Sequence, residues 1–213
     1  MENRTIALAE LGAEERSALL GLARDVLEVS LRGGPANPLP GGPALHRLCG
    51  AFVTLRRGTK LRGCIGHIPA DRPLAEVVAR MAVSAALEDP RFPPVLPEEL
   101  SHLSIEISVL SEPELLADPD PTRIRPGQDG VLVRRGWRQG LLLPQVATEQ
   151  GWGANELLAG VCRKAGLDVD AWREPGTELY VFQVEAFGEG PNGPNNGPER
   201  TPTPPILTAI LRR

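Results

Sequence analysis

The stretch LCGAFVTLRRGTKLRGCIG, residues 48–66, predicts a β-hairpin around which the other elements are arranged. Its first half is apolar and rich in β-favouring side chains, so residues 48–56 are predicted to form a strand. Arg57, Gly58 and Thr59 supply a turn, and residues 60–65 return as a second strand. The segment LRGCIG, residues 61–66, therefore lies on the second arm of the hairpin.

The remaining pattern predicts an α+β fold. Apolar residues recur at helical spacing over residues 13–31, and a second helix is expected after Asp71, which is a candidate cap, with Pro73 in its first turn. Residues 103–110 alternate between apolar and polar, which is typical of a half-buried strand with a polar face. A last strand is predicted over residues 178–187. Because the strands come mostly as hairpins, we expect mostly antiparallel sheets flanked by helices.

Composition divides the chain into three parts. Residues 1–187 are predicted to form a single domain, and no fixed-period repeat is present. Residues 188–205 are rich in Pro, Gly and Asn and predict a flexible arm. The short apolar segment at residues 206–213 is expected to dock back as a helical turn.

Charge and cysteine content limit the partners and the compartment. The 213-residue chain has a formal net charge of −4, so no bulk basic surface for nucleic acid or an anionic membrane is expected. No apolar stretch approaches the length of a membrane span, and the first residues lack a signal-peptide core. Three cysteines form no paired framework, which fits reduced thiols, and a cytoplasmic location is expected.

LRGCIG is the segment whose residues suggest chemistry. Glycine inside a strand often marks a close backbone approach, so Gly63 and Gly66 are expected to leave amides accessible beside Arg62. Amides next to a guanidinium suit a carboxylate or phosphate, and Arg62 is in position to lower the pKa of Cys64, a candidate nucleophile. The alternative is a twisted hairpin arm with a buried, inert Cys64, since free cysteine is among the most buried residue types.

Other candidate ligand-binding residues are spread along the chain. Asp89 and Arg91 flank a proline after the second helix, and a local ion pair is the simpler interpretation of both. Glu106 projects from the polar face of its strand, facing either solvent or a binding site. Lys164 lies near the C-terminus of a predicted helix, where the helix dipole favours a cation. His67 completes this set of candidates.

A metal site is a weaker alternative. His46 and Cys49, and Cys64 and His67, have the spacing of zinc ligands, and the hairpin would bring the two pairs together. However, strand alternation places Cys64 and His67 on opposite faces of the sheet. The sequence therefore predicts no metal, and it names no cofactor.

These motifs resemble the AMMECR domain family, called AmmeMemoRadiSam system protein A in prokaryotes. The resemblance covers about residues 13–187 and rests on LRGCIG together with the following runs: FVTL at 52–55, EDPRFPPV at 88–95, LSIEISVL at 103–110, LLPQVATEQGW at 142–152 and KAGL at 164–167. It implies a larger and a smaller subdomain with a cleft between them, and LRGCIG at that cleft. It also implies association with a Memo-like protein and a radical S-adenosylmethionine protein. The arm at 188–205 departs from the family pattern.

Two functions remain open at this point, and the sequence does not decide whether the protein is an enzyme. In the first, an enzyme or enzyme component binds a small anionic ligand or a modified residue at Arg62, Gly63 and Gly66, beside Cys64. In the second, LRGCIG forms a docking groove or a structural hairpin of a non-catalytic adaptor that works with the Memo-like and radical proteins. The clustering of a cysteine, an arginine and two glycines on one arm favours the first function, and the lack of any recognised catalytic constellation is the argument for the second as the alternative.

Overall fold

A computed structural model describes residues 11–35, 39–189 and 210–212. The chain divides into two compact units. The five-stranded unit contains the described residues up to Val109, residues 185–189 and residues 210–212, and the four-stranded unit contains residues 110–184. The chain therefore passes from one unit to the other after Val109 and again after Val184.

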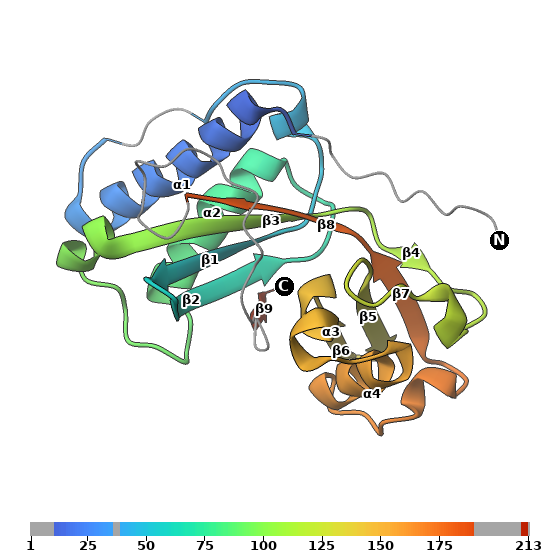
Figure 1. The fold of residues 1–213 in the computed structure, drawn as a ribbon. Helices are drawn as coiled ribbons and strands as arrows, with labels where there is room; N and C mark the ends of the chain where they lie inside the picture. The colour runs from blue at the N-terminus through green and yellow to red at the C-terminus, as the bar shows by residue number, and fades with distance from the viewer. Residues whose placement is uncertain (1–10, 36–38, 190–209, 213) are drawn as a thin grey trace. The chain divides into compact units, whose positions relative to one another are not determined.

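The five-stranded unit is a mainly antiparallel sheet with two long helices. Its strand order is β8-β3-β1-β2-β9, with β1 antiparallel to β2 and β3, and β9 parallel to β2 (Figure 1). Its elements are α1 (Ala13–Arg32), η1 (Ala44–His46), β1 (Ala51–Arg57), β2 (Lys60–His67), α2 (Leu74–Leu87), η2 (Pro97–His102), β3 (Leu103–Leu110), β8 (Val184–Gly188) and β9 (Ile210–Arg212).

The predicted hairpin is confirmed, and it contains a β-bulge. Gly58 adopts a positive φ of 59° at the turn, a conformation that glycine reaches without strain. The register places Leu55 opposite Gly63 and Arg56 opposite Leu61, so Arg62 is the extra residue. A bulge redirects the side chain of its extra residue, which sets Arg62 apart from the regular alternation of β2.

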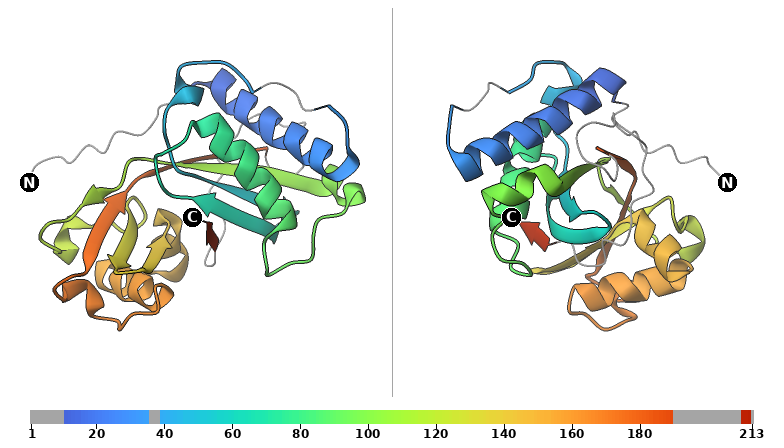
Figure 2. Two further views of the ribbon diagram at one scale, coloured as in Figure 1. Left: turned by 180° about the vertical axis from the view of Figure 1, so that it is seen from behind. Right: turned by 60° about the vertical axis from the view of Figure 1, so that its left-hand side comes forward.

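Both α-helices of this unit lie on one face of the sheet (Figure 2). Each has an apolar stripe at helical spacing, including Leu19, Ala23 and Leu27 in α1, and these side chains pack into one core with the inner face of β1 and β3. The expected cap at Asp71 is wrong. Pro73 is the N-cap of α2, and the Asp71 carboxylate lies 2.6 Å from His67 Nε2 instead.

The polar face expected for residues 103–110 is present but is not a solvent face. Glu106 is 6% exposed and Ser108 only 1%. β3 is an interior strand, flanked by β8 and β1, so its polar side chains stand among those of two neighbours. Thr54 of β1 lies directly opposite Glu106. The alternation predicted the polarity of this face correctly and its burial wrongly.

The four-stranded unit is an antiparallel sheet in the order β4-β7-β5-β6 with two helices. A separate apolar core forms between the sheet and α4, where Val131, Val133, Leu158 and Val161 are fully buried. The elements are β4 (Glu114–Leu115), η3 (Pro121–Arg123), β5 (Gly130–Arg135), β6 (Arg138–Leu142), α3 (Pro144–Gln150), α4 (Ala154–Lys164), η4 (Ala171–Arg173) and β7 (Glu178–Phe182).

The structure corrects two expectations near the C-terminus. The single strand predicted over residues 178–187 is two strands, β7 and β8, which belong to different sheets and are separated by Gln183. Within the segment expected to form a helical turn, Ile210–Arg212 is the strand β9, while residues 206–209 and 213 lie outside the described residues. Most of the predicted arm, residues 190–205, also lies outside them. The α+β class with mostly antiparallel sheets is confirmed.

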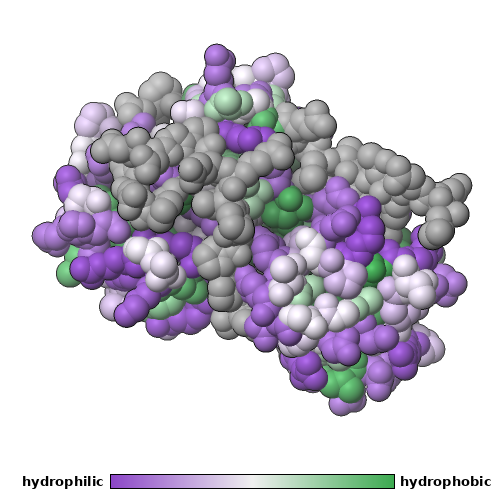
Figure 3. Space-filling view, viewed as in Figure 1, coloured by the Kyte–Doolittle hydropathy of each residue, from purple (hydrophilic) through white to green (hydrophobic). Residues whose placement is uncertain are grey.

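On the face that Figure 3 shows, the described residues are mainly hydrophilic, with small apolar patches among them. Exposed large apolar side chains are scattered over several elements and include Leu48, Leu96 and Trp137. Within the described ranges, no helix has the length and apolarity that crossing a lipid bilayer requires.

Candidate functional site

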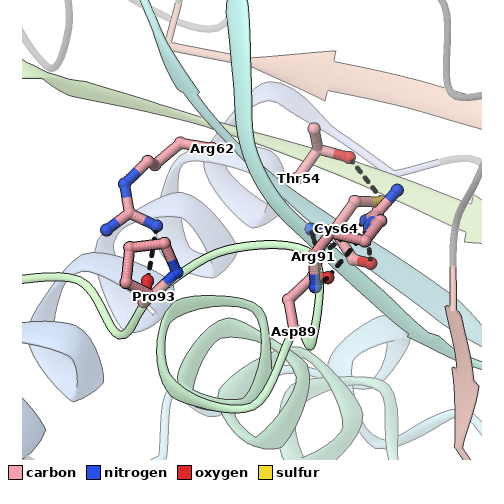
Figure 4. Close-up of polar contacts among 6 residues, drawn as sticks. All are labelled: Thr54, Arg62, Cys64, Asp89, Arg91 and Pro93. Carbon is pink, nitrogen blue, oxygen red and sulfur yellow. Dashed lines mark hydrogen bonds and ion pairs between the residues drawn. The ribbon is translucent and has the colours of Figure 1, made fainter.

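Arg62 binds the proline-rich connector, residues 88–96 between α2 and η2, together with Glu99 of η2. Its Nε and Nη2 donate to the two carboxylate oxygens of Glu99 at 2.9 Å each, a bidentate arrangement. Its Nη1 donates to the carbonyl of Pro93 at 2.9 Å (Figure 4). Nη2 also donates to the carbonyl of Pro94 at 3.2 Å. The bulge aims the guanidinium at these groups. The group expected to receive an anionic ligand therefore holds an internal carboxylate.

The Arg62–Glu99 pair should make stability depend on acid pH. Hydrogen bonds from Arg62 lower the pKa of Glu99 from 4.5 to about 2. Because the folded pKa is depressed, the contribution is fully present above pH 4.5 and is lost as the pH falls towards 2. Allowing for partial exposure, Glu99→Gln is expected to lower the free energy of unfolding by about 1–2 kcal/mol at pH 6. Urea unfolding of both proteins between pH 6 and 2.5 measures this difference.

A surface pair provides the control for that titration. Arg72 and Glu76 are each more than 40% exposed, so Glu76→Gln should change stability by about 0.5 kcal/mol or less at every pH. The difference between wild type and Glu99→Gln should shrink as the pH approaches 2. A difference that stays constant over this range would contradict the assignment.

Cys64 is fully buried in the middle of β2. Thr54, directly across the hairpin, places Oγ1 3.3 Å from the Cys64 sulfur (Figure 4). Burial raises the pKa of the thiol to about 11, although the Thr54 hydrogen bond and the positive charge of Arg91 act in the opposite direction. The lowered pKa expected from Arg62 is therefore wrong, and the thiol is protonated at neutral pH.

Asp89 and Arg91 bind the main chain of Cys64 rather than its sulfur. The Cys64 N–H donates to Asp89 Oδ2 at 2.8 Å, and Arg91 Nη2 donates to the Cys64 carbonyl at 3.1 Å (Figure 4). Arg91 also donates to both carboxylate oxygens of Asp89, at 2.9 and 2.6 Å. Asp89 is 4% exposed. The local ion pair is present, and it satisfies the outer edge of β2 as a neighbouring strand would.

The two glycines of LRGCIG allow close packing on both faces of the sheet. A Cβ at Gly63 would lie 2.0 Å from the carbonyl oxygen of Ala85 in α2. A Cβ at Gly66 would lie 2.1 Å from the ring of Phe52, which stands opposite it on β1. Close approach was the expected role of these glycines, but the approaching groups belong to the chain itself.

The remaining candidates do not gather around Cys64 as a set. His67, at the end of β2, is 5% exposed and contacts Asp71. Glu106 lies in the same cross-strand row as Thr54 and Cys64, on the sheet face opposite the helices. Lys164 is the last residue of α4 and belongs to the four-stranded unit.

Sequence reasoning missed Thr54 and Glu99. Placing Gly58 at the turn gives a regular register in which Cys64 stands opposite Val53, and the bulge at Arg62 shifts the partner of Cys64 to Thr54. Glu99 carries no comparable signal, because its partner Arg62 is 37 residues away. Within the described residues, no group of three or more His, Cys, Asp or Glu side chains is arranged to hold a metal ion.

Comparison with known proteins identifies the family of this chain. The AMMECR1 family model matches residues 20–187. A protein of Methanothermobacter thermautotrophicus is 46% identical over 187 residues, covering 85% of this chain and 97% of its own. The crystal structure of Uncharacterized Protein PH0010 from Pyrococcus horikoshii has a TM-score of 0.76 and 43% identity, and the match covers 83% of this chain and 92% of that one. The hairpin, the LRGCIG strand and the connector that closes its edge all lie within the matched range, and the chain belongs to the AMMECR1 family.

Proposed function

We propose that the protein is a non-catalytic binding module of the AMMECR1 family. One observation carries this proposal, namely that the groups of LRGCIG that suggest chemistry are engaged by the chain itself. Arg62 holds Glu99 and two proline carbonyls, and the Cys64 main chain is held by Asp89 and Arg91. The segment then has a structural part in β2, and its function is to support a surface that a partner binds.

The state of the thiol supports this proposal. A nucleophilic cysteine needs a thiolate and access for its substrate. Cys64 has a pKa raised by burial to about 11 and no exposed surface. Its hydroxyl neighbour Thr54 is not a base that would take the proton at neutral pH. The side chain acts as a small apolar group that packs in the sheet.

Alkylation of the folded protein tests the inertness of the thiol. With iodoacetamide at pH 8, Cys64 should be labelled no faster than the protein unfolds, while in urea Cys49, Cys64 and Cys162 should all react. Peptide mapping by mass spectrometry gives a rate for each site. Cys49, which is 8% exposed, provides the internal comparison. Labelling of Cys64 ahead of Cys49 under native conditions would overturn the non-catalytic interpretation.

The partners of the module are proposed from the family resemblance. A Memo-like protein and a radical S-adenosylmethionine protein are the candidates, in the cytoplasm. Co-purification of the full chain with each of them, followed by calorimetry, should give a stoichiometric complex. Cys64→Ser should bind equally well, because the proposal gives the thiol no chemical part. If neither protein binds, or if the serine variant loses binding while it remains folded, the proposal fails.

A second candidate function is supported by the sheet face opposite the helices. Ser108 is 1% exposed, and its hydroxyl has no hydrogen-bond partner within the described part of the chain. Phe52 of β1 lies opposite it, and Thr54 and Glu106 form the next row. A buried hydroxyl of this kind suits a polar ligand, which would make the protein an enzyme component that binds a small anionic molecule.

A thermal-shift screen distinguishes this second candidate. Small carboxylates and phosphates would be added to wild type and to Ser108→Ala. Without ligand, the alanine variant should be at least as stable as wild type, because an unsatisfied buried hydroxyl is removed. Ligand-induced stabilisation that is weaker in Ser108→Ala would favour the second candidate, and an absence of any shift would count against it.

A further inference from the structure

Two different groups of residues cover neighbouring parts of the outer edge of β2. At Cys64, Asp89 and Arg91 bind the N–H and the C=O that point away from β1. Beyond it, Ile65–His67 pairs in parallel with β9, in the register Ile65–Ile210, Gly66–Leu211 and His67–Arg212. β2 would otherwise be the edge strand of the sheet, with unpaired main-chain groups.

The direction of these main-chain groups follows from the strand period. Because the N–H and C=O of Cys64 point away from β1, those of Gly66, two residues on, point the same way. In a parallel pair, a residue of this orientation bonds to the two residues that flank its partner. The partner of Gly66 is Leu211, so Ile210 and Arg212 supply the bonding groups, and the N–H of Leu211 points away from β2.

We infer that residues 65–67 form a strand-addition site, which an extended segment of a partner protein enters in parallel orientation by displacing β9. Strand addition obtains its affinity from main-chain hydrogen bonds along an exposed edge. The resident strand is only three residues long, so few bonds must break when it leaves. Asp89 and Arg91 limit the site at Cys64, which sets where the incoming strand starts. This inference rests on the proposed binding function and names its surface.

The resident strand indicates the chemistry of the partner segment. Its sequence is Ile-Leu-Arg, two aliphatic residues followed by a basic one. The segment at residues 206–213, ILTAILRR, contains neither an acidic residue nor a proline. Pro205 stands immediately before it. We therefore expect an incoming segment that is aliphatic, free of proline at the pairing positions and basic at its C-terminal end.

A peptide-binding experiment tests the inference. The probe is a fluorescein-labelled peptide of residues 206–213, added to the full chain and to a variant that ends at residue 205. The peptide should bind the shortened variant about tenfold or more tightly than the full chain, because the tethered segment competes at high effective concentration. Fluorescence anisotropy measures both affinities. Equal affinity for the two proteins, or no binding to the shortened one, would overturn the inference.

Backbone N-methylation provides a matched control for the register. An N-methyl group at Arg212 of the peptide removes an N–H that faces β2, whereas one at Leu211 removes an N–H that faces away. Binding should fall by about tenfold or more for the first peptide and change little for the second. Equal binding of both modified peptides would contradict strand addition in this register.

Amide hydrogen exchange in the full-length chain tests the same site without the shortened variant, and so does not depend on the stability of that variant. In the full chain, Leu211→Pro should leave protection of the Gly66 amide nearly unchanged, whereas Arg212→Pro should weaken it, with Val53 in β1 as the protected reference. Equal loss of protection in both variants, or no loss in either, would count against the site. If the peptide does not bind but the full chain still binds its partner proteins, strand addition is wrong and the binding module acts through another surface.

Discussion

Replacing Gly63 with alanine is expected to destabilise the protein by about 3 kcal/mol or more. The new Cβ would lie 2.0 Å from the carbonyl oxygen of Ala85, a main-chain atom inside α2. A side chain can rotate away from such an overlap, but a helix packed on a sheet can only move as a body. α2 lies against both β1 and β2, so this displacement would disturb the core of the five-stranded unit. The midpoint of urea unfolding measures the loss.

Gly21 provides a matched control for this substitution. It lies in the interior of α1 and is exposed, and a Cβ added to it would have no neighbouring atom within 4 Å. Gly21→Ala should therefore stabilise the protein by about 0.5–1 kcal/mol, because alanine loses less backbone entropy in a helix. If Gly63→Ala behaves like Gly21→Ala, the close packing of α2 on LRGCIG is wrong.

The sequence predicted the local elements of the fold well, because each rests on a short-range period. The helix at residues 13–31 and the hairpin around Gly58 are both present within a few residues of the predicted bounds. The strand predicted over residues 178–187 shows the limit of this reasoning. Residues that favour strands stand on both sides of Gln183, while the chain leaves one sheet and enters another. Whether a strand changes sheets depends on which distant strands it pairs with, and the local sequence pattern does not show this pairing.

The sequence singled out several residues of the candidate site correctly, but it did not predict the contacts that they make. Arg62 and Cys64 are separated in the sequence by Gly63 alone, and this proximity suggested an activated thiol. In the strand, Arg62 is a bulge residue directed at Glu99, while Cys64 faces Thr54 across the hairpin. Asp89 and Arg91 were singled out correctly as an ion pair, yet their contact with Cys64 spans 25 and 27 residues. Contacts over such separations depend on the tertiary fold and leave no pattern in one sequence.

Asp89→Ala is expected to be the second severe substitution, lowering the free energy of unfolding by about 3–5 kcal/mol. Burial alone would raise the pKa of Asp89, but hydrogen bonds from Arg91 and from the Cys64 N–H hold it below its ordinary value. Removing the carboxylate leaves the Arg91 guanidinium, which is 21% exposed, without its counter-ion and the Cys64 N–H without its acceptor. Both losses fall on the edge of β2.

The conservative variant separates these two losses. Asp89→Asn keeps an acceptor for the Cys64 N–H but removes the charge that Arg91 binds, so its destabilisation should be smaller than that of alanine. Because the pKa of Asp89 is depressed in the folded protein, its contribution is present above the ordinary pKa of 3.8 and is lost as the pH falls below it. The gap between wild type and Asp89→Asn should therefore narrow in acid. Unfolding in urea at pH 7 and pH 3, with Glu76→Gln as the exposed-pair control, measures both effects. Equal stability of Asp89→Ala and Glu76→Gln at pH 7 would mean that Asp89 and Arg91 do not close the edge of the LRGCIG strand.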